Sequence, residues 1–186
     1  MRKLGVFNFI TLNGYFEGPG RDISWHTHSG EAQEYSEKMS GSGGTLLFGR
    51  LTYELMESYW PTEYAIKNDP IVAENMNKAE KIVFSRTLEK VEWNNTILVK
   101  GNLVEEVKKL KQMQGKDMAI LGSGSIMTQL AEHDLIDEYI FMVDPIVLGE
   151  GTPIFRGLSH KLNLKLIDSR TFKNGIVLLT YRPMER

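Results

Sequence analysis

The strongest constraint on the fold is an alternation of short apolar segments with segments of helical periodicity over residues 1–137. The apolar segments are rich in leucine, β-branched and aromatic residues, which is typical of buried strands. Strands are expected at residues 4–10, 45–48, 81–84, 96–99 and 118–121, and helices at 30–39, 50–59, 70–78, 103–114 and 125–132. Strands that alternate with helices form a mostly parallel sheet covered on both faces, so the pattern predicts a three-layer α/β fold.

The alternation stops after residue 137. Three strand-like segments follow without a helix between them, at residues 139–148, 162–172 and 176–181. Lys173-Asn174-Gly175 separates the last two, and Asn-Gly supplies the positive φ angles that a tight hairpin needs. We therefore expect one domain over residues 1–186, with a twisted, mostly parallel sheet and an antiparallel C-terminal hairpin.

Three residues are expected to start helices. Ser29 precedes the helix at residue 30, and Asp69 precedes Pro70, which suits the first helical position. Asn102 with Glu105 three residues later has the spacing of a capping box.

Composition excludes several classes of protein. Lys and Arg number 22 against 24 Asp and Glu, and this balance argues against a nucleic-acid binder. The chain has no cysteine, which rules out disulfides, thiolate nucleophiles and cysteine-ligated metals and makes the reducing cytoplasm the expected location. No apolar run reaches the roughly 18 residues that cross a bilayer, so no membrane association is expected.

Three expected strands end in residues that suit an anion. Ligands of such sheets bind at the carboxyl ends of the strands, where glycine admits a close ligand and helix N-termini attract negative charge. The three segments are Gly49-Arg50-Leu51-Thr52, Ser85-Arg86-Thr87 and Gly122-Ser123-Gly124-Ser125.

Each segment also has a structural interpretation. Arg50 is one turn before Glu54 and could simply pair with it. Residues 85–87 could be a solvated loop, and Gly122 to Ser125 could be only a turn, because Met127 replaces the last glycine of a dinucleotide fingerprint. Three such ends in one sheet nevertheless favour an anionic ligand. By contrast, His26 and His28 lack a third ligand at a recognisable spacing, so a polar loop without metal is expected there.

The ordered set of motifs resembles the dihydrofolate-reductase-like superfamily. It is more similar still to the C-terminal reductase domain of bacterial riboflavin-biosynthesis deaminase–reductases. The matching segments are Thr11-Leu12-Asn13-Gly14-Tyr15 and residues 49–54, 81–87, 120–125 and 144–155. The resemblance implies a reductase domain without the attached deaminase domain.

The resemblance also implies that NADPH is the cofactor. Gly49, Arg50 and Thr52 would meet its pyrophosphate, and Ser85 and Arg86 its 2′-phosphate. The turn formed by Gly122, Ser123, Gly124 and Ser125 would lie along the pyrophosphate and the nicotinamide ribose.

The implied substrate is a small pyrimidine ribosylamine or pterin. Asn13 stands where the family usually has an aspartate facing the substrate. Glu31 and Glu34 fall near the helix carboxylate that assists protonation in dihydrofolate reductases, although a solvated helix face would also explain both. We take Asn13 and Glu31 as the catalytic candidates. Arg21 and Lys38 are basic residues available to a substrate phosphate.

We therefore predict an enzyme similar to 5-amino-6-(5-phosphoribosylamino)uracil reductase, or a related pterin or pyrimidine reductase. The alternatives are a dihydrofolate reductase and a nucleotide-binding module without turnover. The resemblance suggests a homodimer. The strand at residues 139–143 is apolar on both faces, so it could contribute to a twofold interface or be a fully buried central strand.

Overall fold

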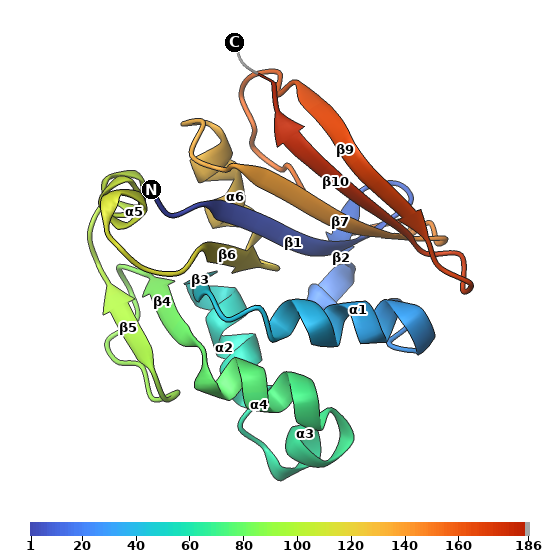
Figure 1. The fold of residues 1–186 in the computed structure, drawn as a ribbon, viewed down its shortest axis with the longest axis horizontal. Coiled ribbons are helices and arrows are strands. Elements are labelled where there is room, and N and C mark those ends of the chain that lie inside the picture. Colours follow the sequence, from blue (N-terminus) through green and yellow to red (C-terminus); the bar gives the residue numbers. More distant parts are fainter. Residues whose placement is uncertain (185–186) are drawn as a thin grey trace.

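The computed structural model describes residues 1–184 and contains an eight-stranded main sheet (Figure 1). The strand order is β5-β4-β3-β6-β1-β7-β10-β9. The strands are β1 (Leu4–Thr11), β3 (Thr45–Gly49), β4 (Glu80–Phe84), β5 (Thr96–Val99), β6 (Met118–Leu121), β7 (Glu138–Asp144), β9 (Leu164–Thr171) and β10 (Val177–Pro183). Pairings among the first six of these are parallel, whereas β10 is antiparallel to β7 and β9. The predicted α/β sheet with an antiparallel C-terminal hairpin is confirmed.

Helices cover both faces of this sheet and complete the three layers. They are α1 (Gly30–Ser40), α2 (Arg50–Tyr59), α3 (Glu63–Asn68), α4 (Pro70–Lys78), α5 (Leu103–Gln112) and α6 (Gly124–Ala131). A small second sheet pairs β2 (Tyr15–Glu17) with β8 (Thr152–Pro153). No helix within residues 1–184 is both long and apolar enough to span a bilayer.

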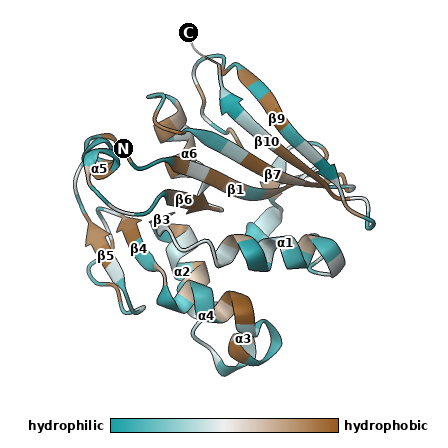
Figure 2. Cartoon of the chain, in the orientation of Figure 1, coloured by the Kyte–Doolittle hydropathy of each residue, from teal (hydrophilic) through white to brown (hydrophobic). Residues whose placement is uncertain are grey.

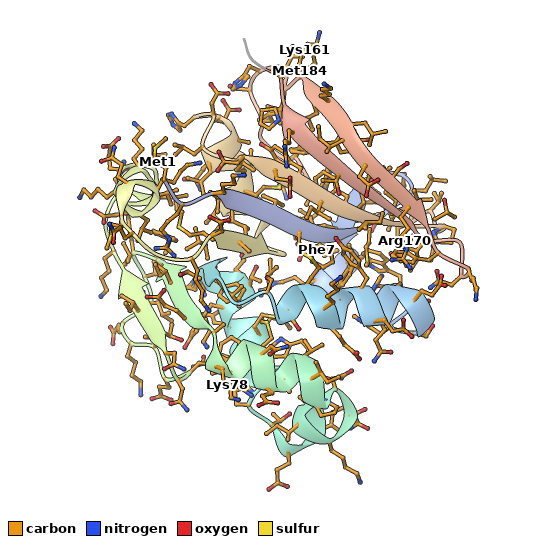
Figure 3. All side chains as sticks on the ribbon, viewed as in Figure 1. Met1, Phe7, Lys78, Lys161, Arg170 and Met184 are labelled. Atoms are coloured by element: carbon orange, nitrogen blue, oxygen red, sulfur yellow. The ribbon has the colours of Figure 1, made fainter. Side chains whose placement is uncertain are left out.

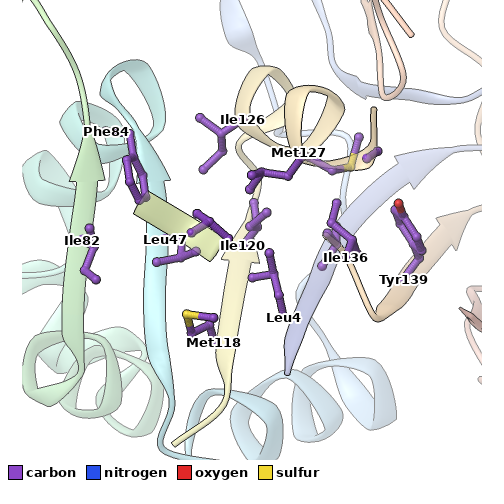
Figure 4. Close-up of a cluster of buried hydrophobic side chains, with 14 of the residues drawn as sticks. Leu4, Leu47, Ile82, Phe84, Met118, Ile120, Ile126, Met127, Ile136 and Tyr139 are labelled. Carbon is purple, nitrogen blue, oxygen red and sulfur yellow. The ribbon is translucent and has the colours of Figure 1, made fainter. Parts of the chain in front are cut away.

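The core follows the alternation of side chains along the strands. On one face, buried residues such as Leu4, Leu47 and Ile120 pack against Ile126 and Met127 of α6 (Figure 4). On the other face, Phe7 points from β1 toward α1 (Figure 3), while Phe48 packs beneath α2 and α4. Apolar residues accordingly concentrate on the central strands (Figure 2). Each fully buried leucine or isoleucine contributes on the order of 1.5–3 kcal/mol to folding.

The structure differs from the sequence predictions at the end of β7, at α3 and at the start of α1. Strand β7 stops at Asp144, because Pro145 cannot donate to a ladder, so residues 145–148 are not strand. Helix α3 was not predicted; its start is capped by Thr62, whose hydroxyl accepts from the amide of Ala65. Ser29 is at the N-cap of α1 but forms no side-chain cap.

The other two helix starts agree with their predicted positions. The side-chain oxygen of Asn102 accepts from the amide of Glu105 at 3.2 Å. Pro70 opens α4 after Asp69, although the Asp69 carboxylate accepts from the hydroxyl of Tyr59 at 2.9 Å and caps no amide.

A buried lysine at the start of β4 donates hydrogen bonds to the C-terminal end of α4. Lys81 is fully buried, and its Nζ donates to the carbonyls of Met76 at 2.9 Å and Ala79 at 2.7 Å, with a longer bond to Asn77. The same ammonium lies 4.4 Å from the ring centroid of Trp93. Burial lowers the pKa of Lys81 to about 8.

Candidate functional site

Two helix N-termini meet at the carboxyl edge of the parallel strands. Strand β3 ends at Gly49, where α2 begins, and β6 ends shortly before α6. Neither helix has a side-chain cap, because Gly49 has no side chain and the Ser123 hydroxyl instead accepts from the Gly49 amide at 3.1 Å. First-turn amides have no acceptor within their own helix, so these two ends favour an anionic ligand.

Asn8 holds the glycine turn in place, and sequence reasoning missed it. Its side-chain oxygen accepts from the amide of Gly122 at 2.7 Å, and the residue is 3% exposed. Gly122 has a φ of 67°, a conformation that glycine adopts without strain. The signal in the sequence was a polar residue at an inward-facing position of an apolar strand, on the same face as Val6.

Most of the predicted cofactor residues come together at this edge. A Cβ placed on Gly122 would lie 3.5 Å from Cγ2 of Thr52, and one on Gly49 would lie 3.6 Å from Oγ of Ser125. Together with Arg50, Ser123 and Gly124, these residues line part of a cavity of about 2220 Å³, which also extends to Arg2 and Lys116 at the amino ends of the strands.

Two of these residues have a further constraint. Arg50 donates to the Glu54 carboxylate at 3.0 and 3.2 Å, which is the alternative that the sequence left open. A Cβ on Gly124 would lie 2.9 Å from the ring of Phe16, so close packing, and not a positive φ, requires glycine there.

Ser85 and Arg86 line a second hollow that adjoins the first. The two share Phe84 as well as Ile126 and Gln129 of α6. The Ser85 hydroxyl accepts from the amides of Thr87 and Leu88 and so shapes the loop. Within residues 1–184, the Arg86 guanidinium has no hydrogen bond or ion pair. The hollow also includes His133 and the start of α5.

The proposed catalytic residues lie elsewhere. The side-chain amide of Asn13 is bonded to the backbone of Leu148, at 2.7 Å to the carbonyl and 3.3 Å to the amide. Glu31 faces the C-terminal hairpin, with its Oε1 3.8 Å from Nζ of Lys173. Neither side chain lines the cavity, whereas Gln33 does, and Glu34 is exposed. The catalytic roles of Asn13 and Glu31 therefore stay predictions.

The two basic residues suggested for a substrate phosphate differ in their position relative to the cavity. Arg21 lines the cavity, in a loop where it has a φ of 65°. Lys38 is exposed on α1 and does not line it.

The segment expected to be a polar loop contains a buried histidine. Nδ1 of His26 lies 2.8 Å from Oδ2 of Asp144, and both side chains are almost completely buried. The His26 ring stacks on Phe9 with centroids 3.6 Å apart, and His28 meets His26 edge-on at 4.5 Å. The prediction of a polar loop is therefore wrong at His26. Among the described residues, no group of three or more His, Asp or Glu side chains could hold a metal ion.

The sheet order, the antiparallel C-terminal strands and the glycine turns at the carboxyl edge define a dihydrofolate-reductase-like domain. Within that class, the chain belongs to the family of RibD C-terminal domains, which it matches over residues 2–178. The sequence-based resemblance is confirmed, and the chain is a reductase-like domain related to the reductases of the riboflavin pathway.

Individual relatives agree with this assignment. The uncharacterized protein YyaP of Bacillus subtilis is 31% identical over 172 residues, which are 92% of this chain and 90% of YyaP. A putative riboflavin biosynthesis protein from Shewanella sp. PV-4 has a similar fold, with a TM-score of 0.77 and 22% identity over 98% of this chain and 99% of the other. Dihydrofolate reductase from Enterococcus faecalis, solved with NADP(H), gives a TM-score of 0.68 and 15% identity, covering 98% of this chain and 97% of that chain.

Proposed function

We propose that this protein is an NADPH-dependent reductase of a small pyrimidine or pterin, similar to the 5-amino-6-(5-phosphoribosylamino)uracil reductases of riboflavin biosynthesis. The observation that carries the proposal is the row of anion-seeking groups along one sheet edge. The uncapped N-termini of α2 and α6 lie at the main cavity, and the unpaired guanidinium of Arg86 lies in the adjoining hollow.

The residues along this edge fit a phosphorylated dinucleotide. The first-turn amides of α2 and α6, with the hydroxyls of Thr52 and Ser125, would hold the pyrophosphate. Arg86 would hold the 2′-phosphate with parallel hydrogen bonds from its planar fork. Arg50 would exchange its bond to Glu54 for a phosphate oxygen, which is a small loss because that pair is exposed. When bound, NADPH supplies the hydride, and the protein supplies orientation.

The remainder of the cavity suits a flat heterocycle. Phe9, Ile23, Leu51 and Leu55 line it, and the last three are exposed apolar side chains that a bound ring could cover. Arg21, which also lines the cavity, is a basic group available to a substrate phosphate.

Thermal unfolding with each nucleotide tests the cofactor assignment. A ligand that binds only the folded state raises the midpoint by mass action, so NADPH at 100 times its Kd adds about 2.7 kcal/mol. We expect millimolar NADPH to raise the midpoint clearly more than NADH does. A midpoint that ignores millimolar NADPH would refute the proposal.

Turnover distinguishes the alternatives. NADPH oxidation is measured with the ribosylaminopyrimidine phosphate, with dihydrofolate and without acceptor, and we expect the pyrimidine to be reduced. Reduction of dihydrofolate alone would favour a dihydrofolate reductase. The position of Asn13 and Glu31 away from the cavity favours a second candidate, a nucleotide-binding module. Binding of NADPH with no turnover on either acceptor would support that module.

A homodimer and a cytoplasmic location remain predictions. Strand β7 lies between β1 and β10, and its side chains from Tyr139 to Met142 are buried, so the residues first considered for an interface form the interior instead. The exposed outer strand β9, with Leu166 and Ile167 on its surface, is the late strand that a twofold interface could use. Sedimentation at micromolar concentration tests this, and a monomer would exclude the dimer.

A further inference from the structure

The pairing of β1 with β6 ends before β1 does, and two histidines lie next to the unpaired part of β1. Strand β1 pairs with β6 only as far as Phe7, opposite Leu121, and then continues along β7 alone. Asn8, the next residue, still bonds to Gly122 at the start of the glycine turn. Phe9 follows and lines the same cavity as the expected cofactor turn.

His26 stacks on Phe9 and is fixed in orientation by Asp144. The two ring centroids are 3.6 Å apart with planes 14° from parallel, and Nδ1 of His26 lies 2.8 Å from the Asp144 carboxylate. Asp144 ends β7 opposite Thr11 of β1, so its position is set by the sheet. A carboxylate bonded to Nδ1 leaves Nε2 as the nitrogen that can exchange a proton.

His28 connects this pair to the cavity. Its ring lies edge-on to His26 at 4.5 Å and to Phe9 at 5.6 Å, and it lines the cavity wall. The charged groups that act on it are His26 from its own loop, Asp144 from β7 and Asp69 from the start of α4. Partial burial, followed by repulsion from His26, lowers the pKa of His28, against the opposing effect of the two aspartates. A lowered pKa makes the imidazolium a stronger acid, while a smaller fraction of the ring carries the proton at neutral pH.

We propose that His28 delivers the proton consumed in the reduction and that the Asp144–His26 pair positions it, an inference that rests on the proposed function. His28 gives a ring proton to the nitrogen of the acceptor's C=N bond while hydride from NADPH adds to the carbon. The π electron pair of that bond becomes the new N–H bond, the acceptor becomes an amine, and NADPH is oxidised to NADP⁺. Neutral His28 then regains its proton from solvent.

A purely structural role is the competing explanation. The buried His26–Asp144 bond would then only anchor the loop that precedes α1 to the end of β7. That role requires neither a protonatable ring at the cavity nor any response of His28 to a nicotinamide. The experiment must therefore follow His28 itself.

The chain has four histidines, so their imidazoles can be resolved by NMR with ¹⁵N-labelled histidine. Single His→Gln variants assign the signals. We expect NADP⁺ to shift the signals of His28 and of His133, which lines the hollow expected to take the 2′-phosphate. The fragment 2′,5′-ADP, which lacks the nicotinamide, should shift only His133. His160, which lies 2.8 Å from Glu132, is the reference that should not move.

The outcomes separate the two proposals. If NADP⁺ shifts His133 but leaves His28 unchanged, the cofactor site stands and the proton-delivery role is overturned. If neither signal moves, the proposed function itself fails. His28 must also titrate between pH 5 and 8 in the NADP⁺ complex, and a signal that does not titrate there overturns the role.

His26→Asn is the variant that tests positioning. Asparagine keeps a donor near Nδ1 for Asp144 but removes Nε2 and the ring. We expect the NADP⁺ affinity to change by less than about twofold, while the titration midpoint of His28 rises because the neighbouring cation is gone. An unchanged midpoint would remove His26 from the proposal. With an acceptor that the wild type reduces, His28→Gln should lower kcat about a hundredfold or more, and an undiminished kcat overturns the proposal.

Discussion

The two edges of the parallel sheet use their polar groups in different ways. At the amino edge, the buried Arg2 donates to the Lys116 carbonyl at 2.5 Å and to the hydroxyl of Thr45, and Lys81 donates to three carbonyls at the end of α4. At the carboxyl edge, two helix starts have no side-chain cap.

This difference separates stability from binding. Buried polar groups are stabilising only when their hydrogen bonds are satisfied, and those at the amino edge are satisfied by the protein. At the carboxyl edge, the first-turn amides of α2 and α6 have no side-chain cap and depend more on water or a ligand. Substitutions at the first edge should therefore change the free energy of unfolding, and substitutions at the second should change nucleotide affinity.

Lys81→Met should have the largest effect. It removes the donor to three carbonyls in a fully buried position, and we expect a loss of about 3 kcal/mol of stability, because each unsatisfied buried group costs about 1–3 kcal/mol. Lys78→Met is the matched control, since Lys78 is exposed and forms an ion pair with Glu74 one turn away; its effect should stay below about 0.5 kcal/mol. Urea unfolding measures both. Equal stability of the two variants would contradict the role given to the amino edge.

Arg86→Ala should show the reverse behaviour. Stability should change little, because the guanidinium is unpaired within residues 1–184, whereas NADPH affinity should fall roughly ten- to a hundred-fold, the value of a charge-assisted bond of about 1.5–3 kcal/mol. NADH, which lacks the 2′-phosphate, is the internal control, and its affinity should fall little. Calorimetric titration gives both constants. Equal losses for the two nucleotides would refute a specific role for Arg86.

Gly122→Ala can be compared with a control variant, Gly157→Ala, whose expected loss of stability is similar. Gly122 and Gly157 both have positive φ, at 67° and 87°, so alanine strains either site by roughly 1–2 kcal/mol. A methyl group at Gly157 meets nothing within 4 Å, whereas one at Gly122 points at Thr52. We expect similar falls in the thermal midpoint but loss of the NADPH-induced rise only in Gly122→Ala. If both variants keep that rise, the turn is not part of the cofactor site.

The sequence predicted the fold better than the site, and the reason is physical. Strand and helix periodicity, the Asn174-Gly175 turn and the Asn102 cap depend on neighbouring residues, and all three appear in the structure. Local chemistry also indicated the glycine turns and Arg86 as candidates for anion binding, and their role stays a prediction. Helix α3 was missed because its six residues are too few to show a period.

Contacts between distant residues could not be predicted in this way. The bond of His26 to Asp144 spans 118 positions, and that of Asn8 to Gly122 spans 114. The orientation of Glu31 depends on the C-terminal hairpin, which lies 142 positions away. Each depends on strand order, which local pattern does not specify. The side chains proposed for catalysis are therefore the part of the molecule that only the structure identifies.

The smallest expected effect is a pH dependence at the amino edge. Burial lowers the pKa of Lys81 to about 8, from 10.5 in the unfolded chain. Between these values the unfolded chain binds a proton that the folded protein has released, so this lysine's contribution to stability rises with pH. Tyr59 acts in the opposite sense at higher pH, because burial raises its pKa to about 12 and stability is lost as pH rises above about 10.

Urea unfolding of the wild type and of Lys81→Met from pH 7 to 9.5 isolates the lysine, because the tyrosine contribution is common to both proteins. We expect the stability difference in favour of the wild type to grow over this range, with little change below pH 7. A difference that stays constant over this range would mean that the three carbonyls and the Trp93 ring stabilise the ammonium at least as much as burial opposes it. The amino edge would then owe part of its stability to the lysine's charge, and the contrast with the ligand-dependent carboxyl edge would be larger than burial alone indicates.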